Sequence, residues 1–273
     1  MRKRVFFLIL LFQKTSVMDY NQYLTKAMQW AKEAGDVTLR YFRNPELKSV
    51  TKQNDFDVLT EADKAAEKVI MDNIRREFPS HSILSEESGT TTVCDSEWLW
   101  VIDPLDGTTN FKQGLPVYSI SIALQHNGET VAGVVYAPYL GEMFHAAKGS
   151  GAFLNGHKLH CGQNDRLSTM VVATGMPYDR DRHPDNNLDN IARVSMQVRG
   201  IRRMGSAAID LAYTAAGYFD AYWELNLNLW DIAAGALMVQ EAGGEVKSIR
   251  SDRNHSIMAG SRTSLNVFRP LIK

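Results

Sequence analysis

The sequence has little cysteine and no excess of charge of either sign. Its two cysteines, Cys94 and Cys161, are too few for a disulfide framework and fit a reducing, cytoplasmic setting. The 30 basic and 31 acidic side chains give a net charge of −1, and they form no basic stripe. We therefore expect no nucleic-acid partner. No apolar run is long enough to span a bilayer as a helix, so no membrane partner is expected either.

The first 17 residues differ in character from the rest. Arg2-Lys3-Arg4 precede the apolar run VFFLILLF, as the charged and apolar regions do in a signal peptide. No small-residue cleavage site follows, and Met18 opens an amphipathic pattern. We interpret residues 1–17 as a leader or a mis-called N-terminal extension, with secretion as the less favoured alternative. Residues 18–273 are expected to form a single domain with lobes at about 18–160 and 161–273.

Hydrophobic periodicity predicts alternating helices and strands. Apolar residues recur at helical spacing over 19–42, and Thr60 with Asp63 gives a capping-box-like start to a second helix that ends before Pro79. Alternating segments after residue 116, joined by the turn Asn127-Gly128, predict a largely antiparallel meander. In the second half we expect strands at 167–174, 201–204, 219–225 and 256–260, and helices at 190–198, 207–217, 230–242 and 262–272. The predicted class is α/β (α+β).

The stretch Trp100–Phe111, WVIDPLDGTTNF, carries the clearest functional signal. A buried strand at Trp98–Ile102 is expected to end at Asp103, because Pro104 cannot donate to a sheet ladder. Asp103 and Asp106 then stand beside a Gly-Thr-Thr turn, whose backbone amides can form an anion-binding hollow. Carboxylates repel a phosphate and amides attract one, so a divalent cation between them would resolve the conflict. The alternative is an ordinary turn with solvated acids.

Three further acids stand at the ends of predicted elements: Asp63, Glu86 and Asp231. Asp231 lies in the first turn of a helix, where the helix dipole favours a negative charge. Small residues follow it at 233–236 and would let this helix pack closely on a neighbour. Asp63 and Glu86 taken singly fit a surface acid better than a ligand, and Asp231 alone could be a simple N-terminal acid of its helix. Together with Asp103 and Asp106 they make a candidate cation-binding set.

These motifs resemble those of the inositol monophosphatase family, in the lithium-sensitive, magnesium-dependent phosphatase superfamily that includes the fructose-1,6-bisphosphatases. The family's Asp-Pro-hydrophobic-Asp-Gly-Thr-Thr-Asn motif stands at Asp103–Asn110, and its Trp-Asp-x-Ala-Ala-Gly motif with a downstream Glu-Ala-Gly-Gly at Trp230–Gly244. A Gly-Glu-Glu-Ser segment stands at Ser85–Ser88, with serine in place of the glycine. The resemblance runs from Met18 to near the C-terminus. It implies a layered α-β-α-β-α sandwich, usually as a homodimer.

The resemblance also implies a set of magnesium ligands. Glu86, Asp103 and the backbone carbonyl of Leu105 would bind a first Mg²⁺, and Asp103, Asp106 and Asp231 a second. A third, weaker ion would lie near Glu86. Oxygen ligands suit this hard cation, and two ions can stabilise the attacking and the leaving oxygen of an in-line displacement.

Further roles follow from the same resemblance. Asp63, Thr108 and Glu86 would act in catalysis, with Asp63 and Thr108 orienting the attacking water. Lys52 matches a lysine on the family's mobile loop. Contacts to the phosphate and to substrate hydroxyls are implied for Gly107, Thr108, Ser206, Ala207, Glu224 and Asp231.

The expected function is the Mg²⁺-dependent hydrolysis of a small-molecule phosphomonoester by a metal-activated water. A polyol phosphate such as myo-inositol 1-phosphate is the first candidate, because an ionised Glu224 can only accept hydrogen bonds and so suits hydroxyls. Glu224 could instead pair with Arg202 or Arg203. Segments 175–183 and 225–229 are expected to form the rim of the substrate pocket, and the second departs from the commonest family pattern.

Other activities on the same scaffold remain alternatives. They are those of a fructose-1,6-bisphosphatase, a histidinol-phosphate phosphatase and a phosphatase for 3′-phosphoadenosine 5′-phosphate. A non-catalytic binding or regulatory protein is more remote, because such a protein is expected to have lost a metal ligand and none is missing here.

Overall fold

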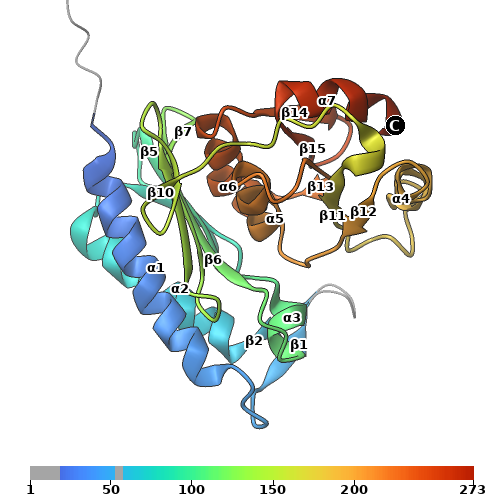
Figure 1. Ribbon diagram of the computed structural model, residues 1–273. Helices are drawn as coiled ribbons and strands as arrows, with labels where there is room; N and C mark the ends of the chain where they lie inside the picture. Colours follow the sequence, from blue (N-terminus) through green and yellow to red (C-terminus); the bar gives the residue numbers. More distant parts are fainter. Residues whose placement is uncertain (1–18, 53–57) are drawn as a thin grey trace, which may run out of the picture.

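The structure, a computed structural model, describes residues 19–52 and 58–273. Its helices and sheets stack in the order helix, sheet, helix, sheet, helix (Figure 1). The predicted α-β-α-β-α sandwich and α/β (α+β) class are confirmed. The interpretation of residues 1–17 as a leader, with Met18 as the start, lies outside the described residues.

The first outer layer consists of α1 (Asn21–Tyr41) and α2 (Glu61–Glu77). Both helices turn an apolar face toward the first sheet, as the periodicity predicts. Trp30 of α1 meets Trp100 of the sheet edge-on, with ring centroids 5.2 Å apart, and both side chains are fully buried. Aromatic packing of this kind fixes the helices on the sheet.

The first sheet is an antiparallel meander extended by one parallel pair. Its strands are β3 (Ser82–Ser85), β4 (Gly89–Thr91), β5 (Trp98–Asp106), β6 (Ser119–His126), β7 (Glu129–Ala137), β8 (Glu142–Ala147), β9 (Gly151–Leu154) and β10 (His157–Lys158). They lie in the order β10-β9-β8-β7-β6-β5-β3-β4, and β3 is parallel to β5. The turn Asn127-Gly128 joins β6 to β7 with positive φ at both residues, as a tight hairpin requires.

Strand β5 continues beyond the point at which the sequence predicts its end. Instead of stopping at Asp103 it runs to Asp106. Asp103 pairs with Ser121 and Asp106 with Ser119, so two residues of β5 bulge opposite one residue of β6. The bulge takes Pro104 out of register, and its missing N–H therefore breaks no ladder bond.

The second sheet closes the other side of the molecule. Its strands are β11 (Val171–Thr174), β12 (Gly200–Arg202), β13 (Ala221–Leu227), β14 (Glu245–Arg250) and β15 (His255–Gly260), in the order β12-β11-β13-β15-β14. The strand predicted over 167–174 is wrong in its first part, because residues 167–169 form a 3₁₀ turn, η1. The sequence analysis did not predict β14, which lies at the sheet edge.

Two helices fill the space between the sheets and two cover the outer face of the second sheet. They are α5 (Ala207–Ala215) and α6 (Leu229–Glu241) inside, and α4 (Leu188–Ser195) and α7 (Arg262–Phe268) outside. The small residues of α6 allow the expected close packing. A Cβ on Gly235 would lie 2.5 Å from Leu211 Cβ of α5, and one on Gly133 of β7 would lie 2.9 Å from Ala234 Cα.

Short elements complete the fold. Strand β1 (Ser49–Thr51) pairs antiparallel with β2 (Val58–Thr60), and α3 (Thr108–Lys112) follows β5 directly. The 3₁₀ turn η2 (Arg269–Leu271) follows α7 near the C-terminus. In the described ranges, no helix combines the length and apolar character needed to cross a membrane.

Candidate active site

The candidate site lies where element ends from both lobes meet. Asp63 stands at the start of α2, Glu86 after β3, and Asp103 and Asp106 at the end of β5. From the second lobe, Asp231 stands in the first turn of α6. The structure therefore brings together the carboxylates that the sequence analysis selected.

Asp103 and Asp231 are both strongly perturbed. The Asp103 side chain is buried, and burial raises the pKa of Asp103 well above its ordinary value. The nearby charges of Glu86, Asp106 and Asp231 raise this pKa further. Burial, followed by the charges of Asp106 and Glu86, likewise raises the pKa of Asp231. The Asn228 amide opposes this by donating a hydrogen bond of 2.7 Å to the Asp231 carboxylate. Such mutual repulsion shows that the acids face a common region.

The carboxylates converge without forming a closed metal centre. Among residues 19–52 and 58–273, no three histidine, cysteine or acidic side chains lie at the spacing of bound metal ligands. Like-charged oxygens keep apart unless a cation lies between them. The candidate donors, carboxylate oxygens and the Leu105 carbonyl implied by the resemblance, are of the chemical type that Mg²⁺ prefers.

Lys52 supplies a cation at one side of this set. Its Nζ lies 2.8 Å from Glu86 Oε1 and 2.6 Å from Glu87 Oε1. These two carboxylates raise the pKa of Lys52 although burial opposes the charge. Burial, followed by the charge of Glu86, raises the pKa of Glu87 to about 7. Lys52 thus neutralises acids that would otherwise repel one another.

Asp63 and Thr108 form a hydrogen-bonded pair. The Thr108 hydroxyl lies 3.0 Å from Asp63 Oδ1 and 3.1 Å from the Leu105 carbonyl oxygen, so its single proton can go to either acceptor. Asp63 Oδ2 accepts from the amide and the hydroxyl of Thr60, at 2.8 and 2.5 Å, which confirms the predicted capping box. Burial is the main cause that raises the pKa of Asp63 to about 6.

Asp106 connects the two lobes. Its Oδ2 accepts from the Ser206 hydroxyl at 2.6 Å and from the Ala208 amide at 2.8 Å, both at the start of α5. Burial raises the pKa of Asp106 to about 6 although these bonds favour its charged form. Gly107 follows with φ +93°, and a Cβ there would lie 3.1 Å from the carbonyl oxygen of Gly205. Only glycine fits this turn easily.

A pocket opens beside the carboxylates. Its walls include Asp106 and Asp231, and the predicted substrate contacts Ser206, Ala207 and Glu224 also line it. Segments 175–178 and 225–228 also line it, together with Arg203, Gly205 and Asp210, so parts of both segments expected at the rim lie at this pocket.

Glu224 lies within β13, inside the strand predicted over 219–225. Its Oε2 accepts from the Tyr222 hydroxyl at 2.7 Å, and burial raises the pKa of Glu224 to about 7. Arg203 lowers this pKa by its charge, yet no ion pair links Arg202 or Arg203 to Glu224 among the contacts of the described residues. A Cβ on Gly175 would lie 1.9 Å from Glu224 Oε1, so this glycine makes room for the carboxylate.

Two further pocket residues were not singled out from the sequence, although Tyr178 lies in the segment 175–183 expected at the rim. Tyr178 lines the pocket and is 55% exposed. Asp210 is buried on α5, and its Oδ1 has no hydrogen-bond partner within the described part of the chain. A lone acid in the apolar run AAIDLA was the available signal for Asp210.

Comparison with known sequences gives a consistent result. The model of the inositol monophosphatase family matches residues 19–266. Nus factor SuhB of Salmonella typhimurium is 41% identical over 242 residues, which cover 87% of this chain and 91% of that protein. The inositol-1-monophosphatase of Mesorhizobium japonicum is 39% identical over 254 residues, which cover 92% and 94% of the two chains.

Solved structures share the fold. The extragenic suppressor protein suhB from Bartonella henselae has a TM-score of 0.85 at 39% identity, covering 92% of this chain and 99% of that one. The inositol monophosphatase from Anabaena has a TM-score of 0.82 at 38% identity, covering 93% and 96%. These likenesses support a phosphatase activity, for which this family generally uses Mg²⁺. The chain belongs to the inositol monophosphatase family.

Proposed function

We propose that this protein is a Mg²⁺-dependent phosphomonoesterase that hydrolyses a polyol phosphate, with myo-inositol 1-phosphate as the first candidate. The observation that carries the proposal is the convergence of Asp63, Glu86, Asp103, Asp106 and Asp231 beside a Gly-Thr turn. Burial raises the pKa of Asp63, Asp103, Asp106 and Asp231, which costs stability, and a cation site would explain why these acids are gathered here.

The cation would be held by oxygen atoms alone. We assign two Mg²⁺ ions, with a third weaker one near Glu86, to a set of carboxylates and one carbonyl: Glu86, Asp103, Leu105, Asp106 and Asp231. When bound, such ions supply positive charge to the attacking and leaving oxygens of a phosphoryl transfer.

The protein's own groups would place the other reactants. The amides of Gly107 and Thr108 would bind the phosphate at the start of α3. A Thr108 hydroxyl that donates to Asp63 Oδ1 keeps lone pairs with which to accept a hydrogen bond from the attacking water. Asp63 is then placed to draw the proton of that water through Thr108, because the two side chains already lie in hydrogen-bond contact.

Glu224 supports a substrate that carries hydroxyl groups. It lines the same pocket as Asp106 and Asp231, so it would face the part of the substrate beyond the phosphate. An ionised carboxylate there accepts from hydroxyls and repels a second phosphate. This favours a monophosphorylated polyol over fructose 1,6-bisphosphate or 3′-phosphoadenosine 5′-phosphate.

One set of assays tests both the reaction and the substrate class. The purified protein should lose hydrolysis of myo-inositol 1-phosphate on chelation and regain it with Mg²⁺, and Asp103→Asn should lower kcat by several orders of magnitude. Glu224→Gln should raise KM for inositol phosphate about tenfold or more relative to an aryl phosphate without hydroxyls, since such charged hydrogen bonds contribute about 1.5–3 kcal/mol.

Distinct outcomes would contradict distinct parts of the proposal. Full activity without divalent metal would overturn the cation site. A wild-type preference for fructose 1,6-bisphosphate would favour the bisphosphatase alternative. No hydrolysis of any phosphomonoester with Mg²⁺ present would favour a non-catalytic role, and several relatives do carry the name Nus factor.

The remaining assignments are proposals of the same kind. We infer a cytoplasmic homodimer whose partner is a small molecule and not a nucleic acid, and we expect Li⁺ to inhibit it. The near-neutral net charge supports the inference that the partner is not a nucleic acid.

A further inference from the structure

One loop at the mouth of the pocket is fastened by a distant turn. The loop comprises residues 176–186, between β11 and α4, and its first residues line the pocket. The turn between β14 and β15 carries Arg253, whose side chain is only 10% exposed. A buried guanidinium group needs hydrogen-bond acceptors for its several N–H groups.

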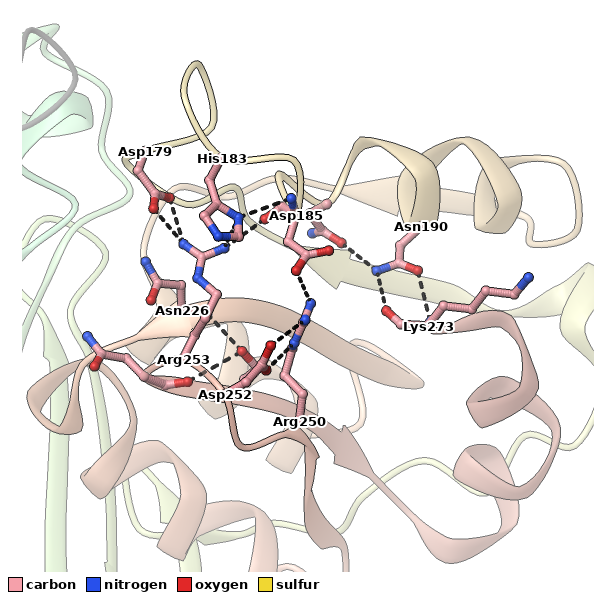
Figure 2. A network of polar contacts seen from close by, with 12 residues as sticks. Asp179, His183, Asp185, Asn190, Asn226, Arg250, Asp252, Arg253 and Lys273 are labelled. Atoms are coloured by element: carbon pink, nitrogen blue, oxygen red, sulfur yellow. Dashed lines mark hydrogen bonds and ion pairs between the residues drawn. The ribbon is translucent and has the colours of Figure 1, made fainter.

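The Arg253 guanidinium binds the loop at several points (Figure 2). Nη2 donates to both carboxylate oxygens of Asp179, at 2.8 and 2.6 Å. Nη1 donates to the Asp185 carbonyl oxygen at 2.9 Å and lies 3.0 Å from His183 Nδ1. The Asp185 amide donates to the same His183 nitrogen at 3.1 Å, so Nδ1 acts as an acceptor. One side chain thus holds both ends of the 179–185 segment.

A neighbouring arginine adds a weaker attachment. Arg250 Nη1 lies 2.5 Å from Asp185 Oδ2, while its other nitrogens bind Asp252 of the same turn (Figure 2). Its side chain is 25% exposed, and the Asp185 side chain is 39% exposed. Exposed pairs contribute little, so Arg253 carries most of the attachment.

Tyr178 directly precedes the clamped Asp179. Tyr178 lines the pocket, and 55% of its surface is exposed there. A ring in this place can cover the C–H face of a cyclic substrate, while the hydroxyl meets polar groups deeper in the pocket.

We propose that Tyr178 contacts the ring of a cyclic polyol phosphate, and that Arg253 is a positioning residue that holds Tyr178 in place through Asp179. The proposal rests on the phosphatase function proposed above. It adds a specificity element that lies outside the cation-binding carboxylates and acts on the part of the substrate that is not phosphorylated.

Kinetics with two substrates test this proposal. Myo-inositol 1-phosphate carries a ring, whereas glycerol 2-phosphate carries none. Tyr178→Ala and Arg253→Gln should each raise KM for the inositol phosphate by about tenfold, which corresponds to about 1.4 kcal/mol of lost contact. For Arg253→Gln, kcat and both constants for glycerol 2-phosphate should stay within about twofold of wild type. Arg253→Lys should recover part of the loss.

A double variant separates positioning from general damage. If Arg253 acts through Tyr178, Arg253→Gln should have little further effect in a Tyr178→Ala background. Arg262→Gln is a matched control, because that arginine is 79% exposed and pairs with Glu245 on the same sheet. Additive effects of the two changes, or equal losses on both substrates, would overturn the proposal.

Amide hydrogen exchange gives a readout that does not depend on activity. In Arg253→Gln, residues 176–186 should exchange faster, whereas the Arg262→Gln control should match wild type. Unchanged exchange in this loop would overturn the positioning role. Complete inactivity of the wild type on both substrates would overturn the proposed function and this inference together, whereas a selective failure in the variants would overturn the inference alone.

Discussion

At the scale of single residues, hydrogen bonds hold the acids of the site in place, although burial disfavours their charged form. Hydrogen bonds from Thr60 hold Asp63, those from Ser206 and the Ala208 amide hold Asp106, and burial still raises both pKa values to about 6. Donors that favour the charged form preorganise a carboxylate for a cation. The resulting strain should be visible in the stability of the metal-free protein.

Asp106→Asn should stabilise the metal-free protein, and increasingly so as the pH rises. The folded-state pKa of about 6 lies above the ordinary 3.8, so the folded protein holds this proton more tightly than the unfolded chain. The burial penalty therefore appears as pH rises from about 4 to about 6 and is fully present above that. The shift from 3.8 to about 6 corresponds to a penalty of about 3 kcal/mol, so Tm should rise by roughly 6–12 °C at pH 8. The gain should be smaller at pH 5.

Thermal melts with a chelator at both pH values measure this gain, and the difference from wild type cancels the titration of other groups. Mg²⁺ provides the control. It should stabilise the wild type more at pH 8 than at pH 5, because it binds the deprotonated carboxylates. A variant less stable than wild type at pH 8 without metal would show that Asp106 serves a structural bond and not a strained site.

At the scale of elements, the turn that carries Glu86 is held from the helix next to it. Glu67 of α2 is buried, and its Oε1 accepts from the Ser85 hydroxyl at 2.5 Å and from the Ser88 amide and hydroxyl at 3.0 and 2.9 Å. The turn at residues 86–87 thus has both its flanking serines anchored to one carboxylate. Supporting bonds of this kind orient metal ligands.

Glu67→Gln should therefore weaken Mg²⁺ binding more than it weakens the fold. It keeps an acceptor oxygen but removes the charge from three hydrogen bonds. Loss of such support costs about 10- to 100-fold in metal affinity. The Mg²⁺ concentration that gives half-maximal activity measures the effect, with Glu97→Gln, an exposed acid of the same lobe, as control. A fall in Tm without a shift in the Mg²⁺ requirement would contradict the supporting role.

Local patterns made most elements and the central acids predictable. The capping box joins Thr60 and Asp63, which are three positions apart, and the strand-turn stretch around Asp103 is contiguous, so both follow from sequence. The contact of Arg253 with Asp179 joins residues 74 apart, and no local pattern contains it. Strand β14 escaped prediction because it is a half-exposed edge strand with charged residues.

At the scale of the whole molecule, the site is the seam between two lobes. Asn110 Nδ2 donates to the Met204 carbonyl oxygen at 2.7 Å, and the Ser119 and Ser206 hydroxyls lie 3.3 Å apart. One apolar core runs from Val101 and Val135 of the first sheet through α5 and α6 to Tyr222 of the second. Candidate site residues of both lobes are thus aligned by shared packing, which supports the proposal of a single domain over 18–273.

If the lobes form one domain, a change confined to the outside of the second lobe should destabilise the first by the same amount. Ser261 caps α7, its hydroxyl accepting from the Ser264 amide at 3.1 Å. Ser261→Ala should cost about 1 kcal/mol, and native-state hydrogen exchange should report this loss equally in β6 and β13. Ser206→Ala, which removes a cap and the bond to Asp106 together, should lower both by a larger common amount. A loss confined to β13 in the Ser261→Ala variant would show instead that residues 18–160 and 161–273 unfold separately, and the site would then be an interface between two domains.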